Sequence, residues 1–125
     1  MKRALVVVTM LLAGCGGESA DLFEVQRSGP GAVDLVVNDG GTATCDKGEA
    51  KALPGKSLLD ARELARQLEK QATLSIELPK GPSAIRRYEV RTQAGRTSFW
   101  DTSPNAPKAF SELQVFTKKI VAEVC

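Results

Sequence analysis

Hydrophobic and polar residues alternate with a period of two over several short stretches of the chain, which is the pattern of half-buried β-strands. In residues 22–27, Phe23 and Val25 fall on one face and polar residues on the other. Two further apolar runs follow at 32–37 and 42–45. The turns between the runs are Ser28-Gly29-Pro30-Gly31 and Asn38-Asp39-Gly40-Gly41. Because Asn, Asp and Gly tolerate the positive φ angles of tight turns, we predict an antiparallel meander here.

Two later segments carry the spacing of three and four residues that is typical of amphipathic helices. The first begins at Ser57, with Asp60 placed as in a capping box. Its apolar residues are Ala61, Leu64, Ala65, Leu68 and Ala72. The second begins near Asn105, with Pro107 acceptable in the first turn. Its apolar residues are Phe110, Leu113, Phe116, Ile120 and Val124. The alternating segment 74–78 predicts a further strand between the two helices.

A β-hairpin is predicted for residues 87–101, between that strand and the second helix. Its strands, 87–92 and 96–101, flank a short turn with Gly95 at the left-handed position. The alternation places three residues on one face: Tyr88, Val90 and Phe99. Trp100 then lies on the opposite face, where it is either a contact residue for a partner or packed beneath a loop or the N-terminal tether.

Together these elements predict an α+β fold: an antiparallel sheet of about five to six strands with two amphipathic helices packed on one face. Residues 21–125 form a single α+β domain in this interpretation. A region of this size suits one modest hydrophobic core.

The first fifteen residues have a different character. The chain begins Met1-Lys2-Arg3, continues with an apolar run, and reaches Leu12-Ala13-Gly14-Cys15. The last four residues resemble the lipobox of bacterial lipoproteins, in which the cysteine receives a lipid before the signal peptide is removed. We therefore predict a signal peptide at 1–14 and a lipidated Cys15 that begins a flexible tether, 15–20. The protein would be anchored by lipid to the extracytoplasmic face of a bacterial membrane, in the cell envelope.

Two alternatives to the lipid anchor stay open. A transmembrane anchor needs about 20 apolar residues, and the run here is about half as long. An ordinary secretory signal would leave Cys15 as a free thiol.

Removal of the signal peptide makes the chain formally neutral. Loss of Lys2 and Arg3 leaves 15 of the 17 basic residues, equal to the 15 acidic residues. The closest approach to a basic cluster is the group of Arg86, Arg87, Arg91 and Arg96, which is interleaved with Glu89 and predicts a solvated strand face. Because nucleic acid binding requires a clustered basic surface, we predict no nucleic acid partner.

Two cysteines remain beside Cys15, namely Cys45 and Cys125. In an oxidising compartment such a pair predicts a disulfide, with two free thiols as the alternative. Two cysteines without any histidine lack the ligands for a closed zinc site, so we predict no metal and no cofactor.

We predict no catalytic residues. Without histidine the usual nucleophile and base pairings are missing. Paired carboxylates are conceivable among the acids scattered along strands and turns, which are Asp34, Asp39, Asp46, Glu77, Glu89 and Asp101.

The order of these elements resembles the emfourin family of small inhibitors of thermolysin-like metalloproteases. The likeness is carried by Phe23 leading into Arg27-Ser28-Gly29, the helix 58–72, Tyr88-Glu89-Val90 before the Gly95 turn, and the helix 113–120. The resemblance implies a non-catalytic inhibitor that places a loop in the active-site cleft of a secreted or envelope metalloprotease, whose zinc belongs to the target enzyme.

The candidate binding residues lie in the two glycine-rich turns and at Trp100. They are Ser28, Gly29, Pro30, Gly31, Asp39, Gly40 and Trp100. Turn geometry alone also explains the glycines. We therefore predict a membrane-tethered, non-catalytic protein-binding module, and the alternative is a structural accessory subunit of a cell-envelope complex. Binding of a small molecule is a third hypothesis, for which so small a core leaves little room.

Overall fold

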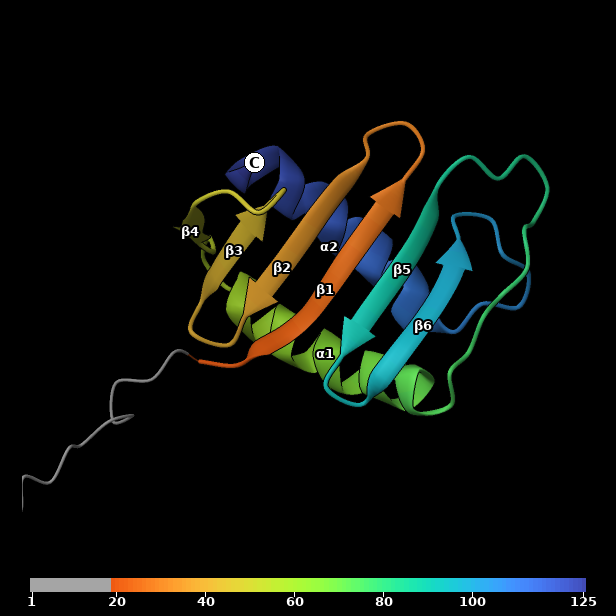
Figure 1. The fold of residues 1–125 in the computed structure, drawn as a ribbon, viewed down its shortest axis with the longest axis horizontal. Coiled ribbons are helices and arrows are strands. Elements are labelled where there is room, and N and C mark those ends of the chain that lie inside the picture. Colours follow the sequence, from red (N-terminus) through yellow and green to blue (C-terminus); the bar gives the residue numbers. More distant parts are fainter. Residues whose placement is uncertain (1–18) are drawn as a thin grey trace, which may run out of the picture.

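The computed structural model describes residues 19–125, so the predicted lipidation site at Cys15 lies outside the described residues. Six strands form one sheet in the order β4-β3-β2-β1-β5-β6, with every neighbouring pair antiparallel (Figure 1). The strands are β1 (Asp21–Ser28), β2 (Val33–Asn38), β3 (Thr42–Cys45), β4 (Ala50–Ala52), β5 (Arg87–Thr92) and β6 (Gly95–Trp100). The predicted α+β class is confirmed.

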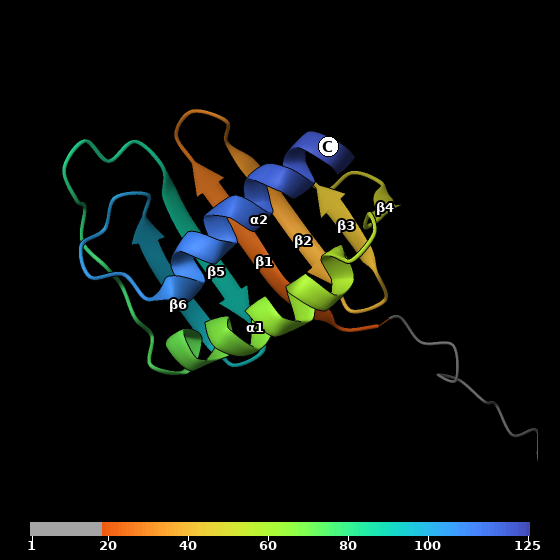
Figure 2. The ribbon, with the colours of Figure 1, turned by 180° about the vertical axis from the view of Figure 1, so that it is seen from behind.

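Two helices, α1 (Ser57–Thr73) and α2 (Lys108–Val124), cover the same face of this sheet (Figures 1 and 2). Helix α1 packs against β1, β5 and β6, and α2 packs against α1 and against β1, β3 and β6. The predicted apolar stripes of both helices are buried against the sheet. The core cluster of the described residues extends from Phe23 to Val124, and all of these residues are contained in the chain from Gly16 onward. In the described part of the chain, neither helix has the length and apolar content needed to cross a bilayer.

Stacked aromatic rings join the sheet to α2. The ring of Phe99 lies between those of Tyr88 and Phe110, with centroid distances of 4.9 and 4.1 Å. Phe23 meets Phe116 edge to face at 5.9 Å. Val90 is buried on the same face as Tyr88 and Phe99, which confirms the alternation predicted for the hairpin.

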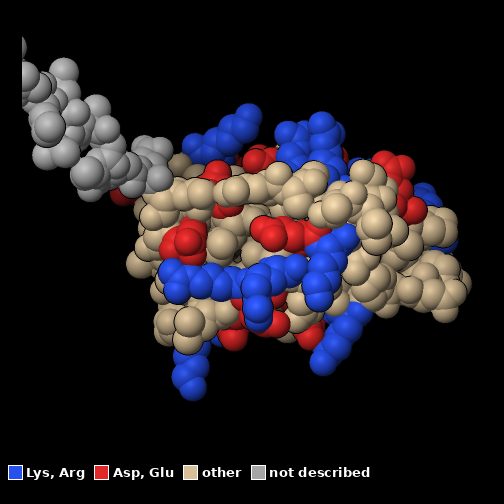
Figure 3. All heavy atoms as spheres, turned by 90° about the horizontal axis from the view of Figure 1, so that it is seen from below, with Lys and Arg blue, Asp and Glu red and all other residues tan. Residues whose placement is uncertain are grey.

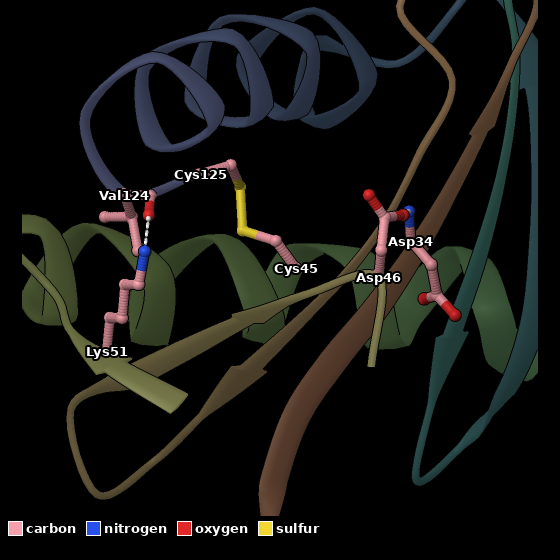
Figure 4. Close-up of a disulfide and its surroundings, with 6 residues drawn as sticks. All are labelled: Asp34, Cys45, Asp46, Lys51, Val124 and Cys125. Atoms are coloured by element: carbon pink, nitrogen blue, oxygen red, sulfur yellow. Dashed lines mark hydrogen bonds between the residues drawn. A yellow bond between two sulfur atoms is a disulfide. The ribbon is translucent and has the colours of Figure 1, made fainter. Parts of the chain in front are cut away.

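A disulfide between Cys45 and Cys125 joins the end of β3 to the residue that follows α2 (Figure 4). The two Cα atoms are 5.9 Å apart and the two residues are 80 positions apart in sequence. Beside it, Lys51 Nζ donates a hydrogen bond of 3.2 Å to the Val124 carbonyl. The C-terminal end of α2 is therefore tied to the β3–β4 side of the sheet.

Helix α1 begins at Ser57 as predicted, but the structure corrects the predicted capping box and the predicted start of α2. The Ser57 side chain does not cap the helix, and its buried hydroxyl has no hydrogen-bond partner. The turn is closed instead by the Ser57 N–H, which donates to the Pro54 carbonyl. Pro107 lies just before the first turn of α2, because the extended ψ of 148° at this residue places the helix start at Lys108.

Two strand predictions also change. The predicted strand 74–78 is a turn followed by a short extended segment, because α1 continues to Thr73 and Ser75 takes a positive φ of 51°. Residues 76–78 nevertheless pair with the outer edge of β6 in a single parallel bridge, Glu77 to Ser98. Strand β4 was not predicted, since its sequence Ala-Lys-Ala is short, exposed and has no strand pattern.

Reduction of the disulfide is expected to lower the stability of the domain substantially. A bridge that closes a loop of 80 residues contributes up to about 4–5 kcal/mol in the chain-entropy model. Urea unfolding of the oxidised chain from Gly16 onward should therefore show a higher midpoint than unfolding of the reduced chain or of the Cys45→Ser/Cys125→Ser variant. Equal midpoints in the oxidised and reduced forms would contradict this prediction.

Candidate functional site

The two glycine-rich turns lie at opposite ends of the sheet (Figure 1). The Asn38–Gly41 turn is next to the residues where the chain joins the domain, since the Asp39 N–H donates to the Ala20 carbonyl at 2.9 Å. The Asn38 amide nitrogen donates to the Ser19 carbonyl and to the Asp21 carboxylate. The Ser28–Gly31 turn lies at the other end of β1, an eight-residue strand that spans about 25 Å. The candidate residues Asp39 and Gly40 therefore do not share a site with the Ser28–Gly31 turn.

The Ser28–Gly31 turn is fixed by two arginines. Arg27 Nε donates to the Gly31 carbonyl and Arg86 Nε to the Pro30 carbonyl, both at 2.8 Å. Gly29 has a φ of +95°, and a Cβ at this position would overlap the Ile85 carbonyl oxygen. The turn is thus packed closely against the segment that precedes β5, and it depends on glycine for both its backbone conformation and its close approach.

Trp100 lies at the same end of the sheet as this turn. Across β1, β5 and β6 the register aligns Ser28 with Arg87 and Arg87 with Trp100. The ring is half-buried on the face opposite Phe99, as predicted, and Lys80 Nζ lies 4.5 Å from its centroid in a cation–π contact. The side chain therefore packs against the loop that contains Lys80 and remains partly exposed. Of the predicted binding residues, the structure brings Trp100 to the end that carries Ser28, Gly29, Pro30 and Gly31.

Charged side chains compensate one another on the uncovered face of the sheet. Glu89 lies at the centre of three arginines, 3.6 Å from Arg87, 3.9 Å from Arg91 and 3.2 Å from Arg96. These contacts agree with the prediction of a solvated strand face for this group. The surface viewed from below also intermingles acidic and basic side chains (Figure 3).

Arg86 does not belong to that group. It lies with Arg27 and Lys118 in a pocket of about 350 Å³ between the sheet and α2, which is lined further by Tyr88, Gln114 and Val115. Sequence reasoning missed this pocket, because Arg27 and Lys118 are remote in sequence and only the packing of α2 brings them together.

A groove of about 570 Å³ lies between α1 and α2. Its apolar residues include Leu64, Phe116 and Val115, the last of which is 69% exposed. Asp60, Glu63 and Glu112 line it together with Lys108 and Lys119, so its charged residues are of both signs.

Most of the acidic residues named above as conceivable paired carboxylates have hydrogen-bond or ion-pair partners within the fold. Asp46 accepts from the Asp34 N–H at 2.9 Å, and Asp101 accepts from the Ile85 N–H at 3.1 Å. Asp39 forms an ion pair of 2.7 Å with Arg62. Within residues 19–125, no three His, Cys, Asp or Glu side chains are grouped so that they could hold a metal ion.

Comparison with known proteins gave no match to a protein-family model, to a curated protein or to a solved structure.

Substitution of Gly29 is expected to disturb the turn more than substitution of another glycine with positive φ. Alanine in the left-handed region costs about 1–2 kcal/mol, and the overlap with the Ile85 carbonyl adds to this at Gly29. Gly55 is the matched control, because its φ is +49° and nothing lies within 4 Å of an added Cβ. Urea unfolding should show a larger loss of unfolding free energy for Gly29→Ala than for Gly55→Ala. Equal losses would show that the close approach at Gly29 contributes nothing to stability.

Proposed function

We propose that this protein is a lipid-anchored envelope lipoprotein whose domain binds a protein partner through the Ser28–Gly31 end. The observation that carries the proposal is the pair of arginine hydrogen bonds that hold this turn in place. The turn lies at the end of β1 that is remote from the point where the chain joins the domain. A turn held in one conformation loses little entropy on binding, so its contacts contribute more fully to affinity.

The position of the turn suits a membrane-tethered protein. A tether of residues 15–20 spans at most about 20 Å when extended. The Asn38–Gly41 turn lies beside the start of the domain and would be nearest the bilayer, whereas the Ser28–Gly31 turn stands one strand length further away. A partner outside the membrane would meet the Ser28–Gly31 turn and the exposed part of Trp100.

Inhibition of a metalloprotease is the specific form of binding that the emfourin resemblance favours. The turn would enter the active-site cleft of a secreted or envelope protease and exclude substrate, and the zinc would be the enzyme's own. Support comes from the α+β fold and from the fixed glycine-rich turn that follows Arg27.

The second candidate function is that of a structural accessory subunit in an envelope complex. The observation that favours it is the groove between α1 and α2, where Val115 is 69% exposed among other apolar residues. An accessory would bind through this groove or through the sheet face that carries Trp100.

The first test is a pull-down from the parent organism's envelope and culture supernatant with the oxidised, unlipidated chain from Gly16 onward. Protease assays follow on whatever is retained. Pro30→Gln alters the exposed turn and is expected to weaken partner capture about tenfold, as for a moderate hot-spot residue. Gly40→Ala, in the turn at the other end, is the control and should leave capture unchanged.

The outcomes separate the two candidate functions. Capture of a metalloprotease that loses activity at near-stoichiometric ratios supports inhibition. Retention of integral envelope proteins alone, with binding that is lost in Ser111→Arg, which lines the groove and not the pocket of Arg27 and Lys118, and kept in Pro30→Gln, would overturn the proposal in favour of the accessory subunit.

Lipid anchoring is tested separately by Cys15→Ser in the full chain. Without the thiol no acyl chain can be attached, so labelling with radioactive palmitate should be lost and the signal peptide should stay uncleaved. A Cys15→Ser protein that is still labelled with palmitate, or a wild-type protein that is not labelled, would contradict the lipid anchor.

A further inference from the structure

Three cationic side chains converge beside the Ser28–Gly31 turn on the helix-covered side of the sheet. Arg27 ends β1 and is aligned with Tyr88 of β5, Arg86 immediately precedes β5, and Lys118 projects from α2. Together they line the pocket of about 350 Å³ described above. We call it the basic pocket.

The basic pocket holds uncompensated positive charge. Its lining contains no Asp or Glu, and among residues 19–125 no ion pair includes Arg27, Arg86 or Lys118. On the uncovered face, by contrast, three arginines share Glu89. Like charges that are held near one another repel, and an anion placed between them relieves that repulsion.

The hydrogen bonds to the turn also orient the two guanidinium groups. Each arginine uses its Nε–H on a carbonyl of the turn, at Gly31 for Arg27 and at Pro30 for Arg86. A guanidinium has five N–H donors in a rigid plane, so the terminal Nη groups remain for another acceptor. Such groups match the oxygen pairs of carboxylates, and the Gln114 amide adds a neutral polar group to the lining.

We propose that the basic pocket binds acidic side chains on a segment of the protein partner. The inference rests on the proposed function and deepens it, because the arginines that line the pocket are the ones that hold the binding turn. A volume of about 350 Å³ is several times that of a single water or small ion, so it has room for more than one carboxylate. The partner's docking segment is therefore acidic.

The test is an NMR titration of the oxidised, ¹⁵N-labelled chain from Gly16 onward with three probes: triglutamate, triglutamine and inorganic phosphate. Triglutamate should cause saturable shifts in the amides of the Ser28–Gly31 turn and of α2 around Lys118, and these shifts should weaken as salt is added. Triglutamine should cause none. Phosphate binding without triglutamate binding would overturn the acidic-peptide assignment.

Lys118→Gln and Lys119→Gln form a matched pair of variants. Both residues are exposed on α2 and the charge change is the same, but Lys118 lines the basic pocket and Lys119 lines the groove between the helices. Loss of one exposed cationic contact should weaken triglutamate binding on the order of fivefold in Lys118→Gln and leave it unchanged in Lys119→Gln. Equal effects in the two variants would overturn the inference.

Failure of this inference can be told apart from failure of the proposed function. Suppose that capture of a protein partner is lost in Pro30→Gln and kept in Lys118→Gln. The proposed function of the Ser28–Gly31 turn is then supported, and the inference of an acidic docking segment is wrong. If triglutamate binds as described and no partner depends on Pro30, the basic pocket stands as an oxyanion site while the proposed function fails.

Discussion

The coverage of one sheet face by two helices is the constraint on which the other features of this domain depend. Helix α2 is fixed near its start by the stack of Phe110 on Phe99, and after its end by the disulfide from Cys125 to Cys45. Between these two points its position across the sheet is set. Lys118 is thereby brought to the ends of β1 and β5, where Arg27 and Arg86 lie.

The same one-sided packing explains the polar character of the other sheet face. Residues that alternate with the core positions of β5 and β6 point away from the helices, and there Glu89 is shared by three arginines. Each of these arginines has Glu89 as an ion-pair partner, whereas Arg27, Arg86 and Lys118 on the helix-covered side have no ion-pair partner among residues 19–125. A partner that docks at the Ser28–Gly31 turn would therefore meet a fixed turn with the basic pocket beside it, while Trp100 lies at the same end on the opposite face of the sheet.

Local sequence patterns predicted most of the fold, because alternation and helical spacing report directly which residues are buried. Tyr88, Val90 and Phe99 share a face as their alternation requires. Patterns failed where tertiary pairing decides the structure: residues 76–78 have the strand alternation but only one bridge to β6, and β4 pairs with β3 although its sequence has no pattern at all. Ser57 has the sequence of a cap, yet the turn closes through backbone bonds and buries its hydroxyl.

The candidate site, like the fold, could be predicted from the sequence only in part. The turn residues were visible in the sequence, and their separation to opposite ends of the sheet follows from the predicted antiparallel meander, because β2 runs from one turn to the other. The convergence of Arg27, Arg86 and Lys118 was not visible, because it depends on the register between β1 and β5 and on the rotation of α2, neither of which is encoded in short-range spacing.

The central claim is that the protein meets its partner through the Ser28–Gly31 end. It is tested most directly by photo-cross-linking in intact envelopes of the parent organism. A photoreactive amino acid is placed at position 30 or position 40 of the full chain, and adducts are identified after irradiation. The account predicts a discrete protein adduct from position 30 and none from position 40. An adduct from position 40 alone would contradict it, because the partner would then contact the end of the domain where the chain enters.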